Sequence, residues 1–231
     1  MTYTFDTLGR PTSVVDETGA GSINYEPTSG TSAKNNKVSK GTTTIRPVDN
    51  LLNYSSFESG LLGWGAWNHD GVLRATSSTE EKFLGTQSIC YSHTITIVNS
   101  TLAQSHTPTK TGDYTFSFYY KTAGLTGSGG LRAIIGLTKT DGTVQYVNGS
   151  YAKESTNGEW DRLSVTATVG DDVAKIRPTI AYQNTYGTVY IDCAQLEYGS
   201  AANEYNLVEN SGFLKTAHVG RIITLLLVMA L

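Results

Sequence analysis

Alternation of apolar and polar residues is the feature that most limits how this chain can fold. Tyr114, Phe116, Phe118 and Tyr120 occupy every second position of one segment, with small hydroxyl residues at 115 and 117. A side-chain period of two is that of a β-strand with one buried face. Further strands are expected at residues 88–97, 131–137, 143–147, 163–169, 175–182 and 188–196. Since no helical period runs longer than about two turns, the chain from residue 49 onward is predicted to be all-β.

The number of these segments indicates the architecture. Roughly eight or nine strands within about 150 residues, each with one apolar face, require two packed layers. We predict a jelly-roll β-sandwich of two antiparallel sheets over residues 49–205. In the segment 88–97, Ile89, Tyr91, Ile95 and Ile97 are expected to face the core. Cys90 and Cys193 fall on or beside expected strands, and unpaired thiols are predicted for them.

Composition excludes several classes of function. Only 16% of the 231 residues are charged and the net charge is −3, which is neither the basic footprint of a nucleic-acid binder nor the charge density of a disordered chain. Plentiful glycine and tyrosine suit short strands and tight turns on an extracellular or cell-surface protein. The apolar run at residues 222–231 is about half as long as a membrane span, so no span is expected.

A duplicated segment indicates the domain organisation. Residues 50–57 return at residues 206–213 with four of eight positions identical. We interpret residues 206–231 as the truncated start of a second module that ends in an apolar tail. Residues 28–48, which are rich in polar residues and have no apolar period, are predicted to be a linker. Residues 1–27 precede it as a separate, short β-hairpin-like segment.

The N-terminal segment has a recognisable motif. Residues 3–10 read Tyr-Thr-Phe-Asp-Thr-Leu-Gly-Arg. This resembles the YD repeat of the bacterial RHS family, Tyr-x-Tyr-Asp-x-x-Gly-Arg, with Phe5 in place of the second tyrosine. The resemblance implies a partial YD repeat over residues 1–27 and a parent protein at the cell surface.

Three segments of the β-domain resemble carbohydrate-binding modules of the family 4/9, or CenC-like, type. They are residues 50–64 with the opening Asn-Leu and Phe-Glu, residues 112–118 with Gly-Asp-Tyr-Thr-Phe-Ser-Phe, and residues 158–163 together with the closing strand 189–197. The resemblance implies a structural calcium between Glu58 and Asp192, helped by backbone carbonyls near Gly85 and Gln87. Calcium takes six to eight oxygen ligands, so carboxylates from distant strands would suit it. The alternative is that both carboxylates accept ordinary hydrogen bonds.

A glycan site needs flat aromatic faces beside polar groups that hydrogen-bond to hydroxyls. Tyr119 is the sharpest aromatic candidate, because its strand phase places it opposite the Phe116 and Phe118 face. Trp64 and Trp160 match positions that the family uses for packing, so both are expected in the core. The remaining candidates are Trp67, Tyr146, Tyr151, Tyr182 and Tyr186, with Arg132, Gln145, Asn148 and Gln183 as polar partners.

Catalysis is not expected. The adjacent carboxylate pairs at 80–81 and 171–172 cannot flank a substrate, and the four histidines show no metal spacing or nucleophile motif. The leading hypothesis is therefore a non-catalytic carbohydrate-binding module of an extracellular RHS/YD-repeat protein, with a polysaccharide or cell-surface glycan and neighbouring modules of the same chain as partners. The alternative hypothesis is a structural spacer or protein-adhesion domain that binds no sugar.

Overall fold

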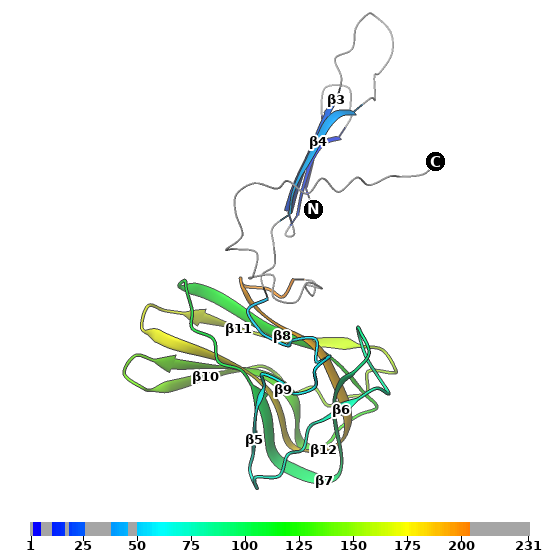
Figure 1. Cartoon of the computed structure of the whole chain (residues 1–231), viewed down its shortest axis with the longest axis vertical. Coiled ribbons are helices and arrows are strands. Elements are labelled where there is room, and N and C mark those ends of the chain that lie inside the picture. The colour runs from blue at the N-terminus through cyan, green and yellow to red at the C-terminus, as the bar shows by residue number, and fades with distance from the viewer. Residues whose placement is uncertain (1, 6–10, 17–18, 26–37, 46–49, 204–231) are drawn as a thin grey trace, which may run out of the picture.

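The computed structural model describes residues 2–5, 11–16, 19–25, 38–45 and 50–203 (Figure 1). Every regular element in this part of the chain is a β-strand, and no helix within it could cross a membrane. The predicted second module at residues 206–231 lies outside the described residues.

The N-terminal strands form an antiparallel sheet of their own. Its order is β1 (Thr2–Phe5), β2 (Pro11–Asp16), β3 (Gly19–Tyr25) and β4 (Val38–Ile45). The expectation that residues 28–48 are linker throughout is corrected by β4, which pairs with β3 along its length. Its sequence lacks an apolar period, but three consecutive threonines and an isoleucine at 42–45 favour extended backbone.

Residues 50–203 form the predicted all-β sandwich. Its strands belong to one continuous hydrogen-bonded sheet that folds over itself into two layers. One layer follows the order β10-β9-β12-β7-β5, and the other contains β8 and β11. The strand bounds are β5 (Gly65–Asn68), β6 (Thr76–Ser78), β7 (Ser88–Ala103), β8 (Gly112–Thr122), β9 (Thr126–Lys139), β10 (Val144–Asn148), β11 (Asp161–Val169) and β12 (Val173–Tyr198).

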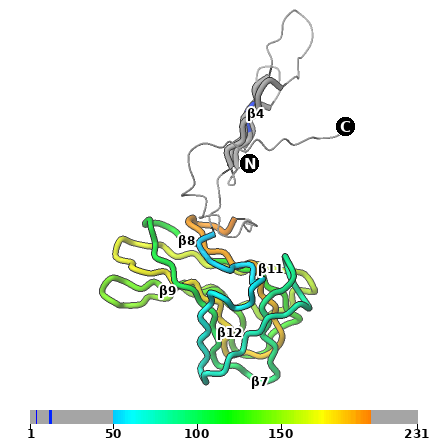
Figure 2. Tube along the Cα trace, viewed as in Figure 1, coloured from blue at the N-terminus to red at the C-terminus, as the bar shows by residue number. Residues whose placement is uncertain are grey.

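Two long strands connect the layers (Figure 2). The first half of β12 pairs with β9, and its second half pairs with β8, while β7 accompanies it on one side. The two strands expected at 175–182 and 188–196 are therefore one strand. The register shift between Thr185 and Gly187 marks the bend, where two residues of β12 are opposite four residues of β7.

The core follows the predicted alternation closely. Tyr114, Phe116, Phe118 and Tyr120 are all buried between the layers, as their spacing predicts. Ile95 is the exception: it is 70% exposed and was wrongly expected to face the core. Between its pairings with Thr185 and Gly187, β12 advances two residues while β7 advances four, from Ile97 to His93, so β7 has two extra residues there. Ile95 lies in this bulge, where the regular alternation of buried and exposed side chains is interrupted.

Candidate binding cleft

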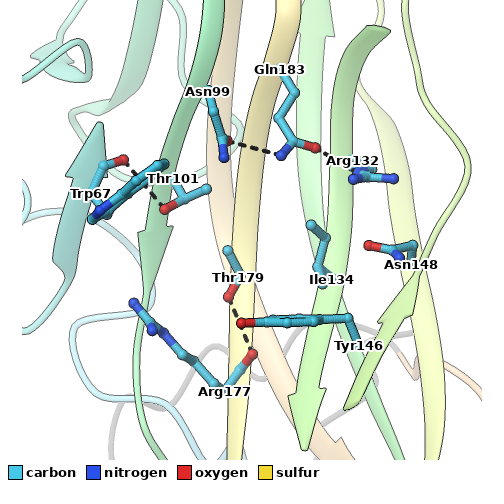
Figure 3. Close-up of a pocket in the computed structure, with 10 residues that line it drawn as sticks. All are labelled: Trp67, Asn99, Thr101, Arg132, Ile134, Tyr146, Asn148, Arg177, Thr179 and Gln183. Atoms are coloured by element: carbon cyan, nitrogen blue, oxygen red, sulfur yellow. Dashed lines mark hydrogen bonds between the residues drawn. The ribbon is translucent and has the colours of Figure 1, made fainter. Parts of the chain in front are cut away.

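The outer face of the five-strand layer holds a cleft of about 520 Å³. Strands β5 and β10 form its two edges, and β7, β12 and β9 form its floor (Figure 3). The edge strands are four strand spacings apart, which is about 19 Å at roughly 4.8 Å per spacing. The cleft is lined by Trp67, Asn99, Thr101, Arg132, Ile134, Tyr146, Asn148, Arg177, Thr179 and Gln183.

Two exposed aromatic rings stand at opposite sides of this cleft. Trp67 on β5 is 50% exposed and Tyr146 on β10 is 61% exposed, and Thr179 lies between them in Figure 3. Tyr146 pairs across the ladder with Gly136 on β9. A Cβ at Gly136 would lie 3.3 Å from Tyr146 Cε1, so the absence of a side chain there lets the ring lie close to the sheet.

A row of hydrogen bonds crosses the floor between these rings. Arg132 Nε donates to Gln183 Oε1 at 2.8 Å, and Gln183 Nε2 donates to Asn99 Oδ1 at 2.9 Å (Figure 3). Tyr151, beside the cleft, adds a hydroxyl 3.4 Å from the same Gln183 oxygen. This row fixes three polar side chains from three neighbouring strands while leaving further donors and acceptors of each free to face a ligand.

The structure brings some of the predicted residues together on this face. Trp67, Tyr146, Arg132, Asn148 and Gln183 all line the cleft, as a shared site requires. Gln145 neighbours Tyr146 in the chain, so the pleat turns it to the opposite face, and it does not line the cleft. Tyr186 is half-buried at the bend of β12 and also lies outside it.

The prediction that Tyr182 contacts a glycan is wrong. It is fully buried, and its ring lies parallel to that of Tyr91 with centroids 4.9 Å apart. Its hydroxyl donates to the Gly187 carbonyl at 3.0 Å. Since adjacent residues on a strand point to opposite faces, the same pleat that brings Gln183 into the cleft drives Tyr182 into the core.

Tyr119 is on the opposite layer and is already stacked. Its ring lies 3.8 Å from that of Phe83 between centroids, with 12° between the planes, and Arg162 Cζ lies 5.0 Å from its centroid. The predicted strand phase is correct, but the segment around Phe83 covers this face. Trp160 is half-buried against Phe83, and Trp64 lies in the core beside Phe57 as expected.

The carboxylates proposed for calcium are occupied by hydrogen-bond donors. Glu58 accepts the Thr86 N–H at 3.0 Å, the Gln87 N–H at 3.2 Å and the Thr86 hydroxyl at 2.5 Å. Gly85 lies against the same carboxylate at φ +74°. Burial raises the pKa of Glu58, but the bonds from Thr86 and Gln87 outweigh it, so the net pKa is lowered.

Asp192 is held in a similar way. It is fully buried, and it accepts the N–H groups of Phe83 at 2.9 Å, Leu84 at 3.2 Å and Cys193 at 2.7 Å. Burial raises its pKa above the ordinary value although these bonds oppose the shift. A loop that presents N–H donors rather than oxygens does not fit a calcium ion, and it ties the distant strands together without one.

Several cleft residues were missed by the sequence reading. Asn99, Thr101, Arg177 and Thr179 lie on the floor strands β7 and β12, and none of them is aromatic. Their only sequence signal is that each alternates with a core residue, such as Ile180 beside Thr179. The cysteines add nothing to a site: Cys90 and Cys193 are both buried, free thiols.

Comparison with solved structures identifies the class of fold. One similar structure is the tandem CBM22-1–CBM22-2 domain of Paenibacillus barcinonensis Xyn10C, with a TM-score of 0.52, 21% identity and coverage of 71% of this chain and 48% of that one. Another is a xylan-binding domain of family CBM22, with a TM-score of 0.50, 14% identity and coverage of 68% and 100%. A third is the Clostridium thermocellum xylanase 10B CBM22-1–GH10 structure, with a TM-score of 0.50, 14% identity and coverage of 68% and 30%.

Residues 50–203 thus have the jelly-roll fold of carbohydrate-binding modules. At these levels of identity the likeness concerns the fold, and the use of the cleft is argued below from its own residues. No protein-family profile and no curated protein sequence matches the chain.

Proposed function

We propose that residues 50–203 are a non-catalytic carbohydrate-binding module that holds a glycan in the cleft between Trp67 and Tyr146. The observation that carries this proposal is the pair of exposed aromatic rings on the two edge strands, with a hydrogen-bonding floor between them. The parent would be an extracellular or cell-surface RHS/YD-repeat protein, which rests on the motif at residues 3–10.

The chemistry of the cleft suits a sugar chain. Each sugar ring has C–H faces that pack on aromatic rings and hydroxyls that need hydrogen-bond partners. Trp67 and Tyr146 supply the faces, and Arg132, Asn148 and Gln183 supply donors and acceptors within the same cleft. The cleft is open across the strands, so a polysaccharide could enter it from the side and would not need a free end to pass through a tunnel.

The lining also favours binding over catalysis. Among the described residues that line the cleft there is no carboxylate and no histidine, the groups that most often transfer protons in glycoside chemistry. The similar structures offer a parallel, since one is described as a xylan-binding domain and another as complexed with xylohexaose. A spacer or adhesion domain without sugar binding remains the second candidate, favoured by the close packing of Tyr119 and Tyr182.

The test is glycan-array binding of the full 231-residue chain, followed by calorimetry on any glycan bound. Trp67→Ala and Tyr146→Ala are compared with Tyr198→Ala, an aromatic that is 51% exposed and lies outside the cleft. We expect binding that both cleft variants weaken and the control retains. A folded chain that binds no glycan would favour the spacer. Equal loss of binding in all three variants would show that the glycan is not held by the two cleft rings.

The size of the effect follows from exposure. A tryptophan side chain offers roughly 250 Å², and half of Trp67 is exposed. Covering that half at about 25 cal/mol per Å² gives at most about 3 kcal/mol. A sugar ring covers only part of this surface, so Trp67→Ala should weaken binding roughly 10- to 100-fold.

A further inference from the structure

The charged side chains that line the cleft are all positive. Two arginines, Arg132 and Arg177, are among its lining residues, and none of the described lining residues is acidic. The whole chain has a net charge of −3, so this concentration of positive charge is local to the cleft and does not reflect the composition of the chain.

Arg132 is held in place by neutral groups. Its Nε donates to the amide oxygen of Gln183 at 2.8 Å, and its Cζ lies 4.6 Å from the centroid of the Tyr151 ring. The amide and the ring fix the direction of the guanidinium without cancelling its charge. The four N–H donors on its terminal nitrogens have no partner within the cleft-lining set and are available to a ligand.

Three other cations of the described chain form ion pairs, whereas cations such as Lys82 and Lys110 do not. Arg74 pairs with Asp70, Lys121 with Glu81 at 2.8 Å, and Lys139 with Asp172 at 2.7 Å. No ion pair of this kind is recorded for Arg132 or Arg177 among the described residues. Both cleft arginines therefore lack a protein counter-charge.

The spacing of the two arginines suits a chain with repeated charges. Arg132 on β9 pairs with Ala181 of β12, and Arg177 lies four residues before Ala181 on β12. Four residues of a strand span roughly 13 Å, so the two guanidinium groups reach different parts of an extended ligand. Arg177 is exposed and pairs with Gly136, the residue over which Tyr146 lies.

We propose that the glycan held in this cleft is anionic, with carboxylate or sulfate groups that pair with Arg132 and Arg177. The inference rests on the proposed carbohydrate-binding function and adds its ligand class. Arginine presents a planar fork that binds both kinds of oxyanion with two parallel hydrogen bonds. Aromatic stacking by Trp67 and Tyr146 holds the sugar rings, and the arginines select those that are charged.

The test uses pairs of polysaccharides that differ only in charge. Polygalacturonate is compared with its methyl ester for the carboxylate, and dextran sulfate with dextran for the sulfate, by calorimetry on the full chain at low and high salt. The variants are Trp67→Ala, Arg177→Gln and Arg177→Lys, with Lys82→Gln as a matched control that removes an exposed positive charge outside the cleft.

We expect the charged member of at least one pair to bind at least about tenfold more tightly, which is about 1.4 kcal/mol. Arg177→Gln should remove most of this preference, Arg177→Lys should restore part of it, and Lys82→Gln should leave it unchanged. High salt should weaken the charged ligand more than the neutral one.

Three results would overturn the inference. If neutral glycans bind as well as charged ones and only Trp67→Ala weakens them, the cleft binds neutral sugar, so the proposed function stands and the inference fails. If Lys82→Gln acts as strongly as Arg177→Gln, the attraction is a general charge effect. If no polysaccharide binds the folded chain, both the function and the inference are overturned.

Discussion

Tyr182→Phe tests whether the cleft face, and not the core face, of β12 binds the glycan. The change removes one hydroxyl, which donates to the Gly187 carbonyl at 3.0 Å inside the protein. Loss of one buried, neutral hydrogen bond lowers the free energy of unfolding by about 1 kcal/mol. The ring remains parallel to Tyr91 at 4.9 Å, so the packing is kept. Glycan affinity should not change, since Tyr182 is fully buried.

Urea unfolding and glycan calorimetry, run on the same preparations, separate these two effects. Tyr182→Phe should lower the urea midpoint with an unchanged slope, which shows that stability alone has changed. Tyr182→Ala should cost about 3–5 kcal/mol, because it leaves a cavity beside Tyr91. Tyr146→Ala should do the reverse, with little change in midpoint and weaker binding. A loss of affinity in Tyr182→Phe while the chain is fully folded would refute the assignment of the two faces.

Three further predictions concern the cleft and the opposite loop. Gly136→Ala places a Cβ 3.3 Å from Tyr146 Cε1; the ring should tilt, and calorimetry should show severalfold weaker glycan binding at nearly unchanged stability. The lowered pKa of Glu58 means that its contribution to stability is present above the unfolded pKa and is lost as pH falls through the folded value; melting temperatures should fall as the pH drops below the ordinary glutamate pKa of about 4.3, and less steeply in Glu58→Gln. Calcium or a chelator should change the melting temperature by less than about 1 °C, because Glu58 and Asp192 already accept N–H donors; a calcium-dependent rise would show that the loop rearranges to offer oxygens.

The sequence was sufficient for the fold because alternation reports burial directly. The period of two at 114–120 places four aromatic side chains in the core, and the structure buries all of them. The prediction failed where a register shift intervened. Ile95 lies between Ile97 and His93, where β7 has two more residues than the facing part of β12, and nothing in the local sequence signals this bulge.

The candidate binding site was harder to predict because alternation does not say which face is open. Tyr119 was correctly placed opposite the Phe116 face, yet Phe83, which is distant in the sequence, covers it. The floor of the cleft is made by ordinary polar residues such as Asn99 and Arg177, which become a site only when β7, β12 and β9 lie side by side. Trp67 was among the candidates because tryptophan offers a flat apolar face and a polar tip, whereas an arginine on a strand gives no comparable signal.

The two outer faces of the sandwich differ in how their polar groups are used. On the β8 layer, Ser117, Asp192 and Glu197 are buried, and each has a partner within the protein: Arg162 donates to Ser117 at 2.9 Å, and the Asn203 N–H donates to Glu197 at 2.9 Å. Polar groups satisfied in this way stabilise the fold but offer little to a ligand.

On the cleft face, the polar groups are only partly satisfied and remain accessible. The row from Arg132 through Gln183 to Asn99 uses one donor of Arg132 and one of Gln183, so their remaining N–H groups can still bond to an incoming hydroxyl or oxyanion. A ligand therefore gains hydrogen bonds on this face without breaking those that hold the sheet. The donors and acceptors that remain available on this floor, together with the exposed rings of Trp67 and Tyr146, are the reason to propose binding in the cleft.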